Sequence, residues 1–161
     1  MKKTRYNPGP LLLLTLLLTL PTSGSAWQVY ANPDNNSART EAESVDGSTN
    51  LSFSCRDGVI YMVLFDYAGN AISRVDNSSM QIRLVFTKPD GSPLHTFTEA
   101  FHYFAPDQAH VLSEQGRSPL ADAWAAGSMM IFQSSSGEEV ARFDLTGTSQ
   151  ARAHFRQVCK V

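Results

Sequence analysis

Three possible metal ligands lie close together in the sequence. His95, Glu99 and His102 are spaced at i, i+4 and i+7, which would place all three on one face of an α-helix as good zinc ligands. The β-branched and aromatic residues around them, however, favour a strand, in which His95 and Glu99 face one way and His102 faces the other. We therefore expect polar residues on an exposed sheet face and no cofactor. A metal site with His110 as a distant fourth ligand is the lesser alternative.

The carboxylates do not form a recognisable catalytic pair. They lie at expected turns, at a hairpin tip or within a strand: Asp66, Asp76, Glu138, Glu139 and Asp144. The sequence also lacks a G-x-S-x-G elbow, a Walker loop and an H-E-x-x-H motif. These observations predict a protein that is not an enzyme.

Aromatic residues are concentrated between positions 97 and 104. On a strand, Phe97, Phe101 and Tyr103 share a face, so that face carries an aromatic stripe. Burial in the core would explain such a stripe, and so would a face that binds a protein partner. The second interpretation predicts a contact surface made by these rings and by a polar, glycine-containing loop at 107–117. The sequence leaves open whether Trp27 is buried or exposed.

Residues 1–26 have the features of a cleaved export signal. Lys2, Lys3 and Arg5 precede an apolar region at 11–20, and Pro21 and several small residues follow it. A membrane-spanning helix needs about 20 apolar residues, so we expect no stable membrane insertion after cleavage. The short basic start is typical of bacteria, and we expect a single domain at 27–161 in the periplasm, or secreted.

The expected mature region is acidic. Without residues 1–26, 10 Lys and Arg remain against 15 Asp and Glu. This balance argues against binding to nucleic acid. The remaining length is enough for one hydrophobic core but not for two.

Cys55 and Cys159 are the only cysteines in the chain. Two thiols in an oxidising compartment are expected to pair. Neither lies in a C-x-x-C motif, so a disulfide is the expected state and a redox or catalytic thiol is the lesser alternative. The link would join the last element of the fold to one near its start.

The pattern of apolar residues predicts strands first and helices late. Alternation indicates an edge strand at 38–45, a hairpin at 51–67 that turns at Asp57-Gly58, and strands at 80–87 and 94–104. Pro119 and Gly127 bound a short helix, and a second hairpin follows at 128–145.

A terminal helix begins at Thr148 or Ser149, and its apolar residues share one face by helical spacing. These residues are Ala151, Phe155, Val158 and Cys159. The order of elements predicts a β-rich α+β fold: an antiparallel sandwich or open barrel with a short helix and a C-terminal helix held by the disulfide.

Residues 120–159 resemble an exported bacterial family. The motif residues are Leu120, Trp124, Gly127, Phe143-Asp144-Leu145, Gly147, Ala151 and Cys159. Their order is similar to that in the family that includes invasion-associated locus B and the periplasmic accessory proteins of type VI secretion. The strand that ends in Cys55 extends the resemblance loosely upstream. It implies a small periplasmic β-rich domain with a disulfide-held helix and no known enzymatic chemistry.

These inferences predict a non-enzymatic accessory protein that contacts a protein partner in the cell envelope. The resemblance adds an association with secretion or virulence. One alternative is a periplasmic immunity or inhibitor protein, since a small acidic domain can match the basic active site of a toxin. A small metal-binding protein is the other alternative.

Overall fold

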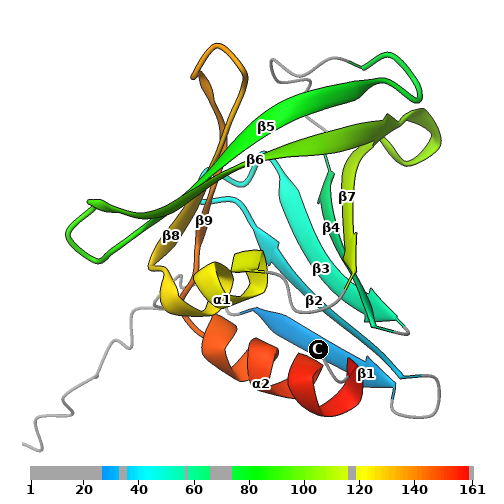
Figure 1. The fold of residues 1–161 in the computed structure, drawn as a ribbon, viewed down its shortest axis with the longest axis vertical. Coiled ribbons are helices and arrows are strands. Elements are labelled where there is room, and N and C mark those ends of the chain that lie inside the picture. Colours follow the sequence, from blue (N-terminus) through cyan, green and yellow to red (C-terminus); the bar gives the residue numbers. More distant parts are fainter. Residues whose placement is uncertain (1–26, 33–35, 57, 66–73, 116–118, 160–161) are drawn as a thin grey trace, which may run out of the picture.

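The structure is a computed structural model that describes residues 27–32, 36–56, 58–65, 74–115 and 119–159. The predicted signal at 1–26 lies outside these residues. The described elements are nine strands, two α-helices and a short 3-10 helix (Figure 1). The strands are β1 (Gln28–Asn32), β2 (Ser37–Glu43), β3 (Asn50–Arg56), β4 (Val59–Phe65), β5 (Ser79–Thr87), β6 (Pro93–Phe104), β7 (Ala109–Gln115), β8 (Met129–Gln133) and β9 (Glu139–Asp144). The helices are η2 (Ala105–Asp107), α1 (Pro119–Ala126) and α2 (Thr148–Cys159).

All nine strands belong to one antiparallel sheet in the order β1-β2-β3-β4-β7-β6-β5-β8-β9. The sheet coils strongly, and the long β5–β6 hairpin lies within it between β7 and β8 (Figure 1). Two hydrogen bonds connect its ends: Trp27 Nε1 donates to Asp144 O, and Val45 N donates to Arg142 O, each at 2.8 Å. The β9 edge therefore lies against the β1–β2 end. The nine-stranded antiparallel sheet and the two α-helices confirm the prediction of a β-rich α+β fold.

The hairpins form where the turn residues predict them. β3 ends at Arg56 and β4 begins at Val59, and Gly58 between them has a φ of 80°. Only glycine adopts such a φ without strain, as a two-residue hairpin turn requires. In β5, the alternating Ile82, Leu84 and Phe86 are fully buried, as their spacing predicts.

α2 packs on β1, β2 and β3, and α1 lies beside α2 and contacts β6 (Figure 1). α1 ends at Ala126, and the residue that follows, Gly127, allows a close approach: a Cβ there would lie 3.0 Å from Leu145 Cδ1 and 3.2 Å from Ala123 O. In α2, Ala151, Phe155 and Cys159 are buried as predicted. Among the described residues, no helix combines the length and the apolar character needed to cross a bilayer.

A cluster of aromatic rings joins the helices to the sheet. Trp124 of α1 stacks on Phe53 of β3 with ring centroids 4.6 Å apart, and it also contacts Trp27 and Phe155 edge-on. Trp27 is only 7% exposed. The structure therefore decides the question that the sequence leaves open for this residue: its ring belongs to the core.

Cys55 of β3 and Cys159 of α2 form a disulfide with their Cα atoms 6.2 Å apart. The predicted pairing is confirmed. Both residues are buried, so the link secures the last turn of α2 against the inner face of the sheet.

Two strands differ from the sequence prediction. Residues 38–45 were expected to form an edge strand, but β2 pairs with β1 and β3 on its two sides, and β1 is the edge. Residues 107–117 were expected to form a polar loop, but β7 occupies most of them and pairs with β4 and β6. Both expectations were wrong because neither segment carries a strong apolar alternation of its own.

Candidate functional site

The three predicted metal ligands diverge on strand β6. His95 pairs with Phe86 and Glu99 with Ile82, so both share the side of β6 that carries Phe101, although His95 itself is exposed. His102 pairs with Ser79, lies on the opposite side and is exposed. Within the described part of the chain, no group of three or more His, Cys, Asp or Glu residues is arranged to hold a metal ion. The geometry therefore offers no metal site at these residues.

The distant candidate, His110, lies in the core. It is fully buried on β7 between Leu64 of β4 and Tyr103 of β6. Its ring centroid is 4.8 Å from that of Tyr103. His110 is thus part of the packing between neighbouring strands and does not face His95 or His102 at the surface.

The aromatic stripe of β6 is mainly core. Phe101 is 0% exposed and Tyr103 is 5% exposed. Phe97 is partly buried, and its ring contacts that of Phe86 at 5.9 Å. The structure corrects the prediction of a partner-binding surface at Phe101 and Tyr103, because buried rings present no area to a partner.

The groups with altered pKa values stabilise turns or the sheet edge. Hydrogen bonds from the Ser44 hydroxyl and from Ser48 lower the pKa of Asp46, and hydrogen bonds from Ser92 lower the pKa of Asp90. The hydrogen-bonded carboxylate of Glu139 raises the pKa of Arg142 on β9. Lowered carboxylate pKa values favour the charged form, whereas a catalytic acid needs a raised one, so these groups do not indicate catalysis.

A groove on the outer face of β1–β4 is the strongest site candidate. Its volume is about 370 Å³, within the range of small-ligand sites. Tyr30, Arg39, Arg56 and Tyr61 line it together with smaller residues from the same strands. Tyr30 is 53% exposed and the Arg39 side chain is 52% exposed, so a partner has access to both.

The strand register explains why a hollow forms here. Tyr30 pairs with Arg39, Arg39 with Ser54, and Ser54 with Tyr61, so these residues form one row across four strands. At about 4.8 Å per strand, the two tyrosines are about 14 Å apart. The short side chain of Ser54, together with Ser37, leaves space between the larger residues. The inward-facing Ala38 and Cys55 contribute the floor.

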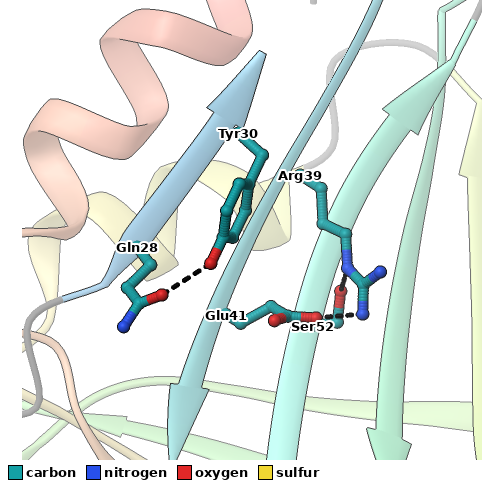
Figure 2. A network of polar contacts seen from close by, with 5 residues as sticks. All are labelled: Gln28, Tyr30, Arg39, Glu41 and Ser52. Atoms are coloured by element: carbon teal, nitrogen blue, oxygen red, sulfur yellow. Dashed lines mark hydrogen bonds and ion pairs between the residues drawn. The ribbon is translucent and has the colours of Figure 1, made fainter. Parts of the chain in front are cut away.

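A polar network orients one of the two arginines (Figure 2). Arg39 Nε donates a hydrogen bond to Ser52 Oγ at 3.1 Å, and its guanidinium forms an ion pair with Glu41. Tyr30 Oη donates to Gln28 Oε1 at 2.6 Å. These contacts hold the Arg39 and Tyr30 side chains in defined positions. The entropic cost of ordering these side chains when a partner binds is therefore smaller.

A second hollow lies between the helices. Asp122, Ser149, Arg152 and Arg156 border it above a floor of alanines, and Asp122 and Arg152 form an ion pair across it. The described lining of this hollow contains no aromatic residue, whereas that of the outer groove contains Tyr30 and Tyr61. We therefore take the outer groove as the candidate site.

The residues of the groove come together only through the strand register. Tyr30, Arg39, Ser54 and Tyr61 are scattered over four segments, and only the register places them in one row. Arg39, Ser54 and Tyr61 each alternate with buried residues on their strands, whereas Tyr30 follows the exposed Val29. An outward-facing row of Tyr and Arg is thus visible once the strand order is known.

Comparisons with known proteins do not assign the chain. No family model matches it, and no curated protein matches it. A solved structure, an endonuclease/exonuclease/phosphatase from Beutenbergia cavernae, is similar over 65% of this chain and 25% of that chain, with 16% sequence identity and a TM-score of 0.31. The chain thus spans about a quarter of that protein, and a similarity at this level supports no inference about fold or activity.

Proposed function

We propose that this protein is exported and acts by non-catalytic contact with a protein partner in the cell envelope. The observation that carries the proposal is the outer groove, which is lined by two tyrosines and two arginines of the sheet. Tyrosine and arginine are enriched among the residues that dominate protein interfaces. The groove replaces the β6 aromatic stripe as the contact surface.

The chemistry of the groove favours binding over catalysis. A serine nucleophile needs an adjacent general base. Among the described residues, the lining of the groove contains no histidine and no carboxylate that could serve as a general base. Cys55 is in the disulfide and has no thiol to offer.

Export is supported by the signal features of residues 1–26 and by the disulfide. An accessory role in secretion or virulence is part of the proposal on the strength of the resemblance in residues 120–159. No feature of the outer groove favours the toxin-inhibitor alternative, because its lining is basic.

Site-specific photocrosslinking in cells tests the contact. A photoreactive phenylalanine analogue at Tyr30 should form a defined crosslink to an envelope protein. The same analogue at Val75, which is 67% exposed on a different part of the chain, should not form that crosslink. Equal crosslinking at both positions, or none at Tyr30, would contradict a contact through the groove.

A further inference from the structure

We infer that the open edge of strand β1 adds an extended strand of the partner protein to the sheet. This inference rests on the proposed function, because β1 carries Tyr30 of the outer groove, and it specifies how the partner is held. The added strand would form hydrogen bonds with the backbone of β1 and would continue the sheet beyond the groove.

β1 is an edge of the sheet in the described part of the chain, where it pairs with β2 alone. An edge strand presents the backbone N–H and C=O groups of alternate residues away from the sheet. Helix α2 does not lie beyond this edge. It contacts β1, β2 and β3 and is linked to β3 by the disulfide, so it lies over the inner face. Another extended backbone supplies donors and acceptors at the spacing of these groups, which makes a strand the matching ligand.

The two edges of the sheet differ in the features that prevent strand addition. Edge strands are commonly protected by charged side chains, proline or bulges. The other edge, β9, carries Glu139, Arg142 and Asp144, and its Arg142 O accepts a hydrogen bond from Val45 N. Strand β1 has the sequence QVYAN, which contains no charged residue and no proline, and its register with β2 is continuous. β1 is therefore the edge that lacks protection against an added strand.

The side chains of β1 are incompletely covered on both sides of the sheet. Val29 pairs with Thr40, which is 0% exposed on the inner side of β2. Val29 lies on the same side but is 37% exposed, although valine is usually buried. Tyr30, on the outer side, is 53% exposed. Side chains on one face of neighbouring strands lie about 5 Å apart, so a strand added beside β1 would cover both residues. An apolar side chain of that strand fits beside Val29.

The edge and the groove together favour a partner protein over a second copy of this chain. Pairing between two copies of β1 would join five residues from each copy, whereas a stable interface has about 20 to 30 residues on each side. The region 27–161 has 15 Asp and Glu against 10 Lys and Arg, so two copies repel each other. A partner strand beside β1 adjoins the outer groove, whose lining includes Tyr30. The partner can therefore contact the edge and the groove at the same time.

Two isomeric peptides test the inference on the oxidised, ¹⁵N-labelled mature protein by NMR titration. Both are forms of acetyl-Thr-Val-Thr-Val-Thr-amide with two backbone N-methyl groups, each of which replaces an N–H donor. Successive N–H groups of a strand point to opposite edges. N-methyl groups at the second and fourth positions therefore block one edge of the peptide and leave the other edge able to pair. N-methyl groups at the second and third positions block both edges.

The peptide with one free edge should shift the amide signals of β1 and should bind about fivefold more tightly than its isomer, the difference expected for one net hydrogen bond. The signals of β9, the other edge of the same sheet, are the internal control and should not shift.

Two proline variants test the site. Of the Val29 and Tyr30 N–H groups, one points to β2 and the other to the open edge, because successive residues alternate. Val29→Pro and Tyr30→Pro remove these donors separately, and each is the control for the other. The variant that keeps the wild-type melting temperature has lost the donor at the open edge, and its dissociation constant for the one-edge peptide should rise about fivefold. If neither variant folds, the two peptides on the wild-type protein decide the question.

Equal affinity for the two peptides, no binding of either peptide, equal shifts in β9, or unchanged binding to the folded proline variant would overturn the inference. Shifts of the β1 signals with protein concentration, in the absence of peptide, would also overturn it, because the added strand would then come from a second copy of this chain. If Tyr30 crosslinks to an envelope protein while the two peptides bind equally, the contact function stands and only the strand-addition inference fails.

Discussion

Replacing Cys55 and Cys159 by alanine removes the covalent link between β3 and α2. The disulfide closes a loop with a sequence separation of 104 residues. In the loop-closure model, a disulfide that closes a loop of this length destabilises the unfolded state by about 4.7 kcal/mol. Removal of a native disulfide lowers the measured free energy of unfolding by about 2 to 5 kcal/mol. We expect the free energy of unfolding to fall by an amount in this range.

A loss of this size is large for a single domain, whose total stability is about 5 to 15 kcal/mol. At about 4 °C per kcal/mol for a domain of this size, a loss of about 2 to 5 kcal/mol should lower the melting temperature by about 8 to 20 °C. Differential scanning calorimetry and urea unfolding measure both quantities. Wild-type protein reduced with dithiothreitol serves as the control and should behave like the alanine variant.

The structure also predicts where the variant opens first. Near its start, α2 is anchored by the Thr148 hydroxyl, which lies within hydrogen-bond distance of Leu145 O and Trp124 O, and further along by the contact of Phe155 with Trp124. Its last turn is joined to the sheet through Cys159. Hydrogen exchange should therefore accelerate first in the last turn of α2. Unchanged protection there together with an unchanged melting temperature would refute this account.

Four further predictions concern export, metal, core and pH. The exported protein should begin at Trp27 by intact-mass measurement, and a product that retains residues 1–26 would contradict the signal assignment. Chelators and the double change His95→Ala with His102→Ala should alter stability by less than about 0.5 kcal/mol; stoichiometric zinc that is lost with function would show the opposite. Phe101→Ala should lower the free energy of unfolding by about 3 to 5 kcal/mol because the ring is fully buried, and a fully stable variant would argue against its core role. Hydrogen bonds lower the pKa of Asp46 in the folded state. The charged carboxylate of Asp46 therefore stabilises the fold above the ordinary carboxyl pKa, and this stabilisation is lost as pH falls through the lowered pKa. Asp46→Asn should destabilise the protein at pH 7 but not at pH 2, and an equal effect at both pH values would contradict this assignment.

Local patterns in the sequence were enough to predict most elements and the disulfide. The alternation of Ile82, Leu84 and Phe86 predicted a half-buried strand, and these residues are fully buried on β5. Gly58 predicted the first hairpin turn and has the positive φ that such a turn requires. Cys55 and Cys159 could pair only with each other. These features depend on neighbouring residues or on counting, so no knowledge of the tertiary structure was needed.

Strand β7 shows what local patterns could not predict. Its residues are of mixed polarity, and its inward-facing positions include His110 as well as Leu112. The segment becomes a strand because β4 and β6 offer it hydrogen-bonding partners on both sides. Its stability therefore comes from pairing with distant segments and not from its own propensity.

The candidate site was decided by the tertiary structure alone. The sequence contains Tyr30, Arg39, Arg56 and Tyr61, but it does not indicate that they share one face of the sheet. The register of three strand pairs brings them to one outer face. The same alternation places Phe101 inside, where it contributes to the core. Alternation shows which residues share a face of one strand, whereas only the order and register of strands determine which faces of different strands combine into a surface.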